Sequence, residues 1–145
     1  MILLPPSVQI YLATEPVDLR RGHDGLAALV RQQWSVELYA GHLFVFIGRR
    51  RDRCKILFWD RGGFVLYYKR LERGQFRLPV AASDGRAVAL DGTQLLMLLD
   101  GIDVSRVRRP AAWVPLRPSG TQQIRHHDQN VVDSTRARSS PPATR

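Results

Sequence analysis

The sequence predicts a small single domain of the α+β class, with an antiparallel sheet of about four or five strands and two helices. Short apolar runs of strand length recur between Gly- and Arg-containing turns, and two other segments carry apolar residues at helical spacing. The 145 residues are enough for one hydrophobic core. We expect residues 1–118 to form this domain around a core of about 8–103, and residues 119–145 to be a disordered basic tail.

The first two elements are predicted to be a strand and a helix. Apolar residues alternate in SVQIYLAT, residues 7–14, which is typical of a strand with one buried face. Leucines and valines then recur at helical spacing, which predicts a helix from about Gly22, its N-cap, to Gln33. Gly25 weakens that helix, so we expect another backbone to come close to it.

The centre of the chain predicts three consecutive antiparallel strands. HLFVFIG and CKILFWD are joined by the basic turn RRRDR, and FVLYYKRLE follows after the turn DRGG. Pairing Trp59 with Phe64, and Ile47 with Cys54, leaves both faces of this sheet apolar near the middle. We therefore expect other elements to pack on both faces, or one face to serve for self-association.

The later elements are shorter. GQFRLPV is predicted as an edge strand that ends at Pro79, and RAVAL as a further strand. DGTQLLMLLDGID predicts a short apolar helix, with Thr93 as the candidate cap and Gly101 as the stop. The proline-rich VRRPAAWVPLRPSG that follows is expected to be extended.

The charge of the chain is high and unevenly distributed. The net charge is +9 and the pI is near 10.9, which favours a polyanionic partner. Residues 49–77 hold ten basic and three acidic groups, and residues 106–145 hold eight and two, while the remaining residues are mildly acidic. Segregation of this kind predicts a surface in use rather than a general aid to solubility.

The basic stretch 49–77 is the candidate nucleic-acid surface. The guanidinium fork suits phosphate because it donates two parallel hydrogen bonds. The turn RRRDR would present the main contacts, namely Arg49, Arg50, Arg51 and Arg53. Support is expected from Lys55, Lys69, Arg70, Arg73 and Arg77. Tyr68 and Trp59 are candidates to stack on bases, with core packing as the alternative. The alternative for the charges is a solvated turn that protects a sheet edge.

The segment DLRRGHD, just before the predicted helix, offers a second charged cluster. Asp18, Arg20 and Arg21 predict an ion-paired corner that holds the strand to the helix. An anion site beside the helix N-terminus is the alternative.

Catalytic and metal-binding patterns are missing from the sequence. The four histidines lack metal-ligand spacing, and Asp52 and Asp60 fall in predicted turns. With Cys54 as the one cysteine, no disulfide within the chain and no multi-thiolate zinc site are expected. We predict a protein that is not an enzyme and has no cofactor. The start of the chain lacks a basic signal region, and no apolar run approaches the roughly 20 residues that span a bilayer, so a cytoplasmic location without membrane contact is expected.

Two long segments resemble a known family. These are YLATEPVDLRRGHDGLAALV and GHLFVFIGRRRDRCKILFWDRGGFVLYYKRLERGQFRLP, with LLMLLDGID similar to the closing helix of the family. The likeness covers roughly residues 8–103 and is to the small accessory protein of the insertion-sequence family numbered sixty-six, often labelled TnpB or second open reading frame. This is not the RNA-guided nuclease that shares the label. His23 stands where the family pattern has a larger apolar residue, and the sequence after about Pro118 does not match it.

The resemblance implies a protein that assists DNA transposition, encoded beside a larger transposase that carries the catalytic acids. We therefore expect a non-catalytic accessory protein that binds nucleic acid, or bridges DNA and the transposase, through the basic hairpin. The alternative is a protein-interaction module that binds the transposase or a second copy of itself without touching DNA. Both DNA and RNA are candidate partners.

Overall fold

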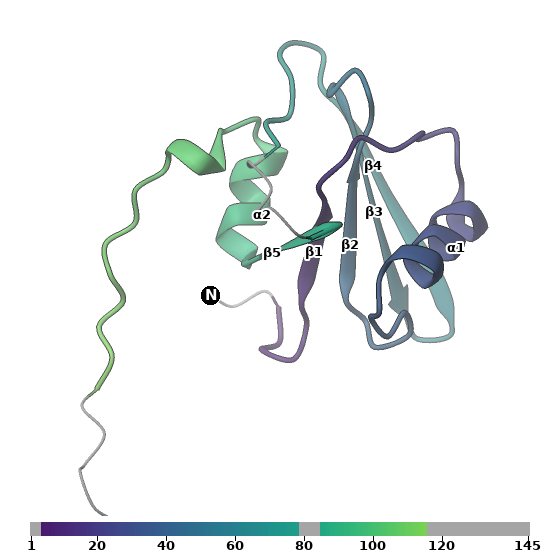
Figure 1. Ribbon diagram of the computed structural model, residues 1–145, viewed down its shortest axis with the longest axis horizontal. Coiled ribbons are helices and arrows are strands. Elements are labelled where there is room, and N and C mark those ends of the chain that lie inside the picture. Colours follow the sequence, from purple (N-terminus) through teal and green to yellow (C-terminus); the bar gives the residue numbers. More distant parts are fainter. Residues whose placement is uncertain (1–3, 79–84, 116–145) are drawn as a thin grey trace, which may run out of the picture. The chain divides into compact units, whose positions relative to one another are not determined.

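In the described part of the chain, residues 4–78 and 85–115 of a computed structural model, five strands form one sheet (Figure 1). Their order is β4-β3-β2-β1-β5. The strands are β1 (Ile10–Ala13), β2 (Leu43–Ile47), β3 (Arg53–Asp60), β4 (Gly63–Arg70) and β5 (Ala87–Leu90). Neighbours run antiparallel except β1 and β2, which are parallel. With two α-helices, this confirms the predicted α+β class.

The parallel pair exists because a helix connects its two strands. Parallel neighbours need a long crossover, and α1 (His23–Gln33) lies in the connection between β1 and β2. Gly22 is the N-cap, as predicted, although no side chain caps this helix. The expectation for Gly25 was wrong: a methyl group there would meet the Cβ atom of Arg21 at 3.1 Å, a side chain of the same segment rather than another backbone.

The register of the central strands is the predicted one. Trp59 pairs with Phe64, and Ile47 pairs with Cys54. The β3–β4 hairpin turns through two residues with positive φ, Arg61 at 35° and Gly62 at 93°. Two such residues fit the twist of a hairpin, which explains the DRGG signal.

Elements pack on both faces of the sheet, which is the first of the two predicted alternatives. On one face, α1 buries Leu26 and Val30 against a cluster that includes Phe44 and Phe46. On the other face, α2 (Gly92–Leu99) packs its buried leucines against a cluster that includes Val45. The sheet therefore forms the middle layer between two helices (Figure 1).

Two predictions about the later elements were wrong. Residues 74–78 form no strand, because their backbone bonds to the β2–β3 turn rather than to a neighbouring strand. Thr93 is not the helix cap: the Asp91 carboxylate accepts the Gln94 N–H at 2.8 Å, and the Gln94 side chain accepts the Asp91 N–H at 2.9 Å. An acceptor at the N-cap position satisfies the free amides better than a residue already inside the helix.

Other predictions hold or fall outside the described residues. The predicted strand RAVAL is β5, and Gly101 ends α2 with a φ of 77°. A short 3-10 helix, Val104–Arg106, follows. Met1–Arg109 forms one compact unit, and a separate unit begins at Pro110. Residues 107–115 contain no helix or strand. Pro79, the border at 118 and the tail 119–145 lie outside the described residues.

The Asp91 cap yields a stability prediction. Asp91→Ala removes the acceptor for the Gln94 N–H and is expected to lower the free energy of unfolding by about 1 kcal/mol. Asp91→Asn keeps an oxygen at that position but loses the charge that pairs with Arg109, so a smaller loss is expected. Urea unfolding of the three proteins measures both values. Equal losses in the two variants would contradict the capping role.

The same carboxylate makes stability depend on pH. Hydrogen bonding from Arg109 is the main cause that lowers the pKa of Asp91 below its ordinary value. A carboxyl whose pKa is lower in the folded state stabilises that state fully above its unfolded pKa, and this contribution is lost as pH falls through the folded pKa. The difference in free energy of unfolding between the wild type and Asp91→Asn should therefore become smaller in acid.

Candidate nucleic-acid interface

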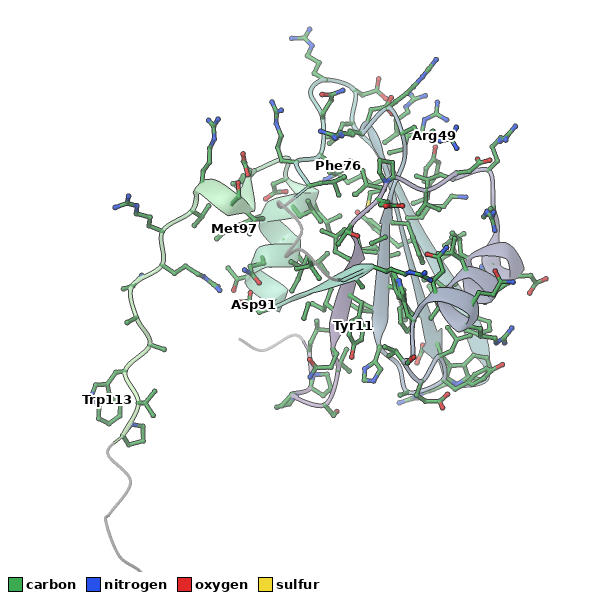
Figure 2. The ribbon with its side chains drawn as sticks, in the orientation of Figure 1. Tyr11, Arg49, Phe76, Asp91, Met97 and Trp113 are labelled. Atoms are coloured by element: carbon green, nitrogen blue, oxygen red, sulfur yellow. The ribbon has the colours of Figure 1, made fainter. Side chains whose placement is uncertain are left out.

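The β2–β3 turn gathers the predicted arginines at one end of the sheet. The turn is closed by the Gly48 N–H, which donates to the Arg53 carbonyl at 2.9 Å, and by the Arg51 N–H, which donates to Gly48 at 2.8 Å. Arg51 adopts a positive φ of 60°, the conformation that lets the chain reverse in so few residues. Arg49, Arg50, Arg51 and Arg53 are all exposed. We call this group the arginine turn; Figure 2 shows Arg49 at this end of the sheet.

The loop after β4 holds the arginine turn in place. Three consecutive carbonyl groups of the turn each accept a hydrogen bond from residues 71–76. The donors are Gln75 Nε2 to Arg50 (3.0 Å), Phe76 N–H to Arg51 (2.6 Å) and Leu71 N–H to Asp52 (2.7 Å). The turn is therefore held through its backbone, and its arginine side chains are exposed.

Phe76 anchors that loop in the core. Its side chain is fully buried in the cluster on the α2 face of the sheet. In Figure 2 it lies at the same end of the sheet as Arg49. Burial of one large aromatic ring stabilises a loop that otherwise has little apolar content. Sequence reasoning missed this role, although Phe76 is the single aromatic residue among the polar residues of RLERGQFR.

A cleft of about 440 Å³ opens beside the arginine turn. Its lining combines cations, two carboxylates and one aromatic ring: Val17, Asp18, Leu19, Arg20, Arg49, Arg50, Asp52, Arg53 and Tyr68. Tyr68 is 51% exposed, so its ring is open to a flat partner. Arginines beside an exposed ring are the groups that bind phosphate and stack on bases.

The predicted ion-paired corner forms one wall of this cleft. Arg20 Nη2 lies 2.6 Å from the Asp18 carboxylate. Hydrogen bonding from the Arg20 side chain is the main cause that holds the pKa of Asp18 well below its usual range. Arg21 takes no part in the pair; its side chain lies against Gly25. Because Asp18 neutralises Arg20, the free positive charge of the cleft comes mainly from the arginine turn.

Lys55 and Lys69 lie on opposite faces of the sheet and each has a structural partner. Lys55 Nζ donates to the Arg21 carbonyl at 2.9 Å and lies 5.4 Å from the centre of the Tyr68 ring. Lys69 Nζ donates to the Leu99 carbonyl at 2.6 Å, at the C-terminal end of α2. Cations are favoured at that end of a helix. The expectation that Lys55 and Lys69 support phosphate contacts stays a prediction.

The other supporting arginines lie near the loop. Arg70 pairs with Glu72 at 2.7 Å, and the same pairing raises the pKa of the Arg70 guanidinium. Arg73 and Arg77 are exposed on the loop that Phe76 anchors. Trp59, the other candidate for stacking, is at the opposite end of the sheet, where it packs edge-on against Tyr39. Of the two predicted stacking residues, only Tyr68 lies in the cleft.

Within residues 4–78 and 85–115, no group of three or more His, Cys, Asp or Glu side chains is placed to hold a metal ion. Cys54 is fully buried, and burial raises the pKa of its thiol to about 12. The thiol therefore stays protonated at neutral pH and is a poor nucleophile. The Nδ1 atom of His42 accepts the Gln9 N–H at 3.1 Å. No helix of the described residues is long and apolar enough to cross a bilayer.

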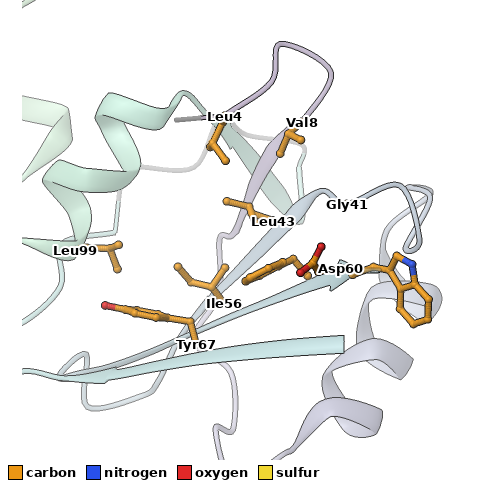
Figure 3. A pocket seen from close by; sticks show the side chains of 10 residues that line it. Leu4, Val8, Gly41, Leu43, Ile56, Asp60, Tyr67 and Leu99 are labelled. Carbon is orange, nitrogen blue, oxygen red and sulfur yellow. The ribbon is translucent and has the colours of Figure 1, made fainter. Parts of the chain in front are cut away.

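An apolar pocket of about 510 Å³ lies between α2 and the sheet, away from the arginine turn (Figure 3). Leu4 and Val8 come from the N-terminal segment, and Ile56, Tyr67 and Leu99 from β3, β4 and α2. The remaining lining residues are Gly41, Leu43, Phe58, Trp59 and Asp60. The pocket offers an apolar ligand a site with one carboxylate at its rim.

Fold and site together define a small α+β protein with a rigid arginine-rich end. The model of the IS66 Orf2-like protein family matches residues 8–109. The chain belongs to this family, which confirms the resemblance. It is thus an accessory protein of an insertion sequence.

Two similar proteins come from one organism. The uncharacterized protein y4jC of Sinorhizobium fredii is 40% identical over 110 residues, which are 76% of this chain and 92% of that protein. The uncharacterized protein y4hO of the same organism is 39% identical over 97 residues, 67% of this chain and 83% of that protein. No solved structure matches the chain.

Proposed function

We propose that the protein assists transposition by binding nucleic acid through the arginine turn and the adjoining cleft. The main support is that three consecutive carbonyl groups of the turn accept hydrogen bonds from residues 71–76. These bonds hold four exposed arginines at one end of the sheet. A preorganised cluster loses less side-chain and loop entropy on binding than a mobile one. Arg49, Arg50, Arg51 and Arg53 contact phosphates, supported by Arg73 and Arg77.

Tyr68 extends the proposal to unpaired bases. Its ring is exposed and lines the cleft together with Arg49 and Arg53. Stacking of a base on such a ring is worth about 1–3 kcal/mol and needs an unstacked base. Single-stranded segments therefore fit the cleft better than an intact duplex.

Salt dependence tests the proposal. The full chain is titrated onto labelled duplex and single-stranded DNA by fluorescence anisotropy, in a series of salt concentrations. If about six to ten phosphates are engaged, affinity falls roughly 10³- to 10⁵-fold between about 50 and 200 mM salt. Binding that is absent, or that does not change with salt, contradicts the proposal.

A second candidate is a module that binds the element-encoded transposase without touching DNA. The apolar pocket between α2 and the sheet favours it, because an apolar side chain of a partner would fit there (Figure 3). This candidate predicts a stable complex with the transposase that survives high salt, together with weak DNA binding. Leu43→Lys at the pocket would weaken that complex and leave DNA binding unchanged.

A further inference from the structure

The outer edge of β4 is open in the described part of the chain. β4 is the terminal strand of the sheet and pairs with β3 along all eight of its residues. The two-residue turn closes with a hydrogen-bonded pair, Asp60 and Gly63, and such pairs alternate along a hairpin. The backbone N–H and C=O groups of Phe64, Leu66 and Tyr68 therefore point away from β3, toward the open edge.

Among the residues that the structure describes, this edge lacks the usual protection against pairing with another strand. Natural edges are blunted by proline, by bulges, by central charges or by shortness. β4 contains no proline, and its register with β3 is continuous. Its charges, Lys69 and Arg70, are the last two residues of the strand. Three exposed large apolar side chains lie along it instead: Val65 (39%), Tyr67 (43%) and Tyr68 (51%).

We propose that β4 pairs antiparallel with β4 of a second copy, about a twofold axis at Leu66. This register joins the outward backbone groups and keeps each side chain on its own face of the sheet. Val65 then lies opposite Tyr67 of the second copy, and Phe64 lies opposite Tyr68. Aromatic and β-branched pairs of this kind stabilise neighbouring strands. The edge is therefore complementary to itself.

Charge favours the same register. Lys69 of the second copy lies opposite Gly63, which has no side chain and leaves Asp60 of β3 uncovered on the same face. The Lys69 ammonium has three donors and uses one for the Leu99 carbonyl, so two donors remain, and its charge is opposite to that of Asp60 of the other copy. An axis one residue further along, at Tyr67, would instead place Lys69 opposite Val65. The proposal does not depend on nucleic-acid binding.

Sedimentation of the full chain tests the dimer. The wild type is expected at twice the mass of one chain, and the double variant Val65→Lys, Tyr67→Lys as a monomer. Dimer affinity should fall by more than about tenfold, since cations replace two apolar cross-strand contacts. Ala89→Lys, at the exposed edge of β5, is the control and should leave the dimer intact. A monomeric wild type would overturn the proposal, as would a double variant that is folded by circular dichroism and still dimeric.

Disulfide trapping tests the register. Because Cys54 is buried and its pKa is raised to about 12, an added surface cysteine reacts alone. Val65→Cys and Tyr67→Cys proteins of different size are mixed and oxidised. The mixed disulfide should form fastest, because opposed residues of a non-hydrogen-bonded pair have Cα atoms about 4.5 Å apart, within disulfide range. The register would be overturned if the Ala89→Cys protein formed a disulfide as fast as the mixture does. It would also be overturned if either cysteine variant alone formed a disulfide as fast as the mixture.

Discussion

Changing Arg49, Arg50 and Arg53 to Ser and Arg51 to Asn is expected to weaken DNA binding roughly 10²- to 10³-fold at about 0.15 M salt. Each arginine that contacts a phosphate releases counterions, so loss of four contacts lowers the slope of log affinity against log salt by about 3 to 4. Asn is chosen at position 51 because it tolerates the positive φ there. Anisotropy titrations of the full chain measure both quantities.

The backbone of the turn should survive these changes. Gln75 and Phe76 bond to carbonyl groups of the turn and not to its side chains. A matched control removes the same charge elsewhere, by replacing four arginines of the C-terminal region with Ser: Arg125, Arg136, Arg138 and Arg145. An equal loss of affinity in the control would mean that overall charge, and not the arginine turn, governs binding.

Phe76→Ala is expected to lower the free energy of unfolding by about 3–5 kcal/mol, the usual cost of removing a buried phenylalanine. That is a large share of the roughly 5–15 kcal/mol that stabilises a small domain. The ring is fully buried, and the same residue donates its N–H to the Arg51 carbonyl. The substitution should therefore also loosen the arginine turn. Urea unfolding measures the stability loss.

Phe76→Leu is the control because it keeps most of the buried apolar volume. We expect a loss of less than about 1.5 kcal/mol and DNA affinity close to the wild type. A loss under about 1 kcal/mol for Phe76→Ala would show that the loop does not depend on this anchor. The backbone amide at position 76 should exchange its hydrogen slowly in the wild type. Faster exchange at this position in Phe76→Ala would confirm the link to the turn.

Local signals explain which parts of the fold were predictable. The turns RRRDR and DRGG set the register of β2, β3 and β4, because a short hairpin turn determines which residues face each other. The helix over His23–Gln33 followed from its apolar spacing. Apolar residues on both faces of the central strands also predicted that other elements would pack on both faces or that one face would serve for self-association, and the two helices bear out the first alternative.

Long-range contacts explain the rest. The hydrogen bonds that tie residues 71–76 to the arginine turn join segments on two different connections, so no local pattern reveals them. The same holds for the parallel pairing of β1 with β2, and for the structural partners of Lys55 and Lys69. The basic surface could be predicted by its composition. The contribution of Arg20 and Tyr68 to one cleft required the fold.

Nucleic-acid binding by the arginine turn is tested most directly by an NMR titration of the isotope-labelled full chain with a short single-stranded oligonucleotide. We predict amide shifts that cluster at one end of the sheet, in residues 18–20, 48–53 and 68–77. The opposite end, around Gly41 and the turn at Arg61–Gly62, should not move. Shifts confined to that opposite end or to the C-terminal region after residue 115 would contradict the assignment of the arginine turn as the nucleic-acid interface.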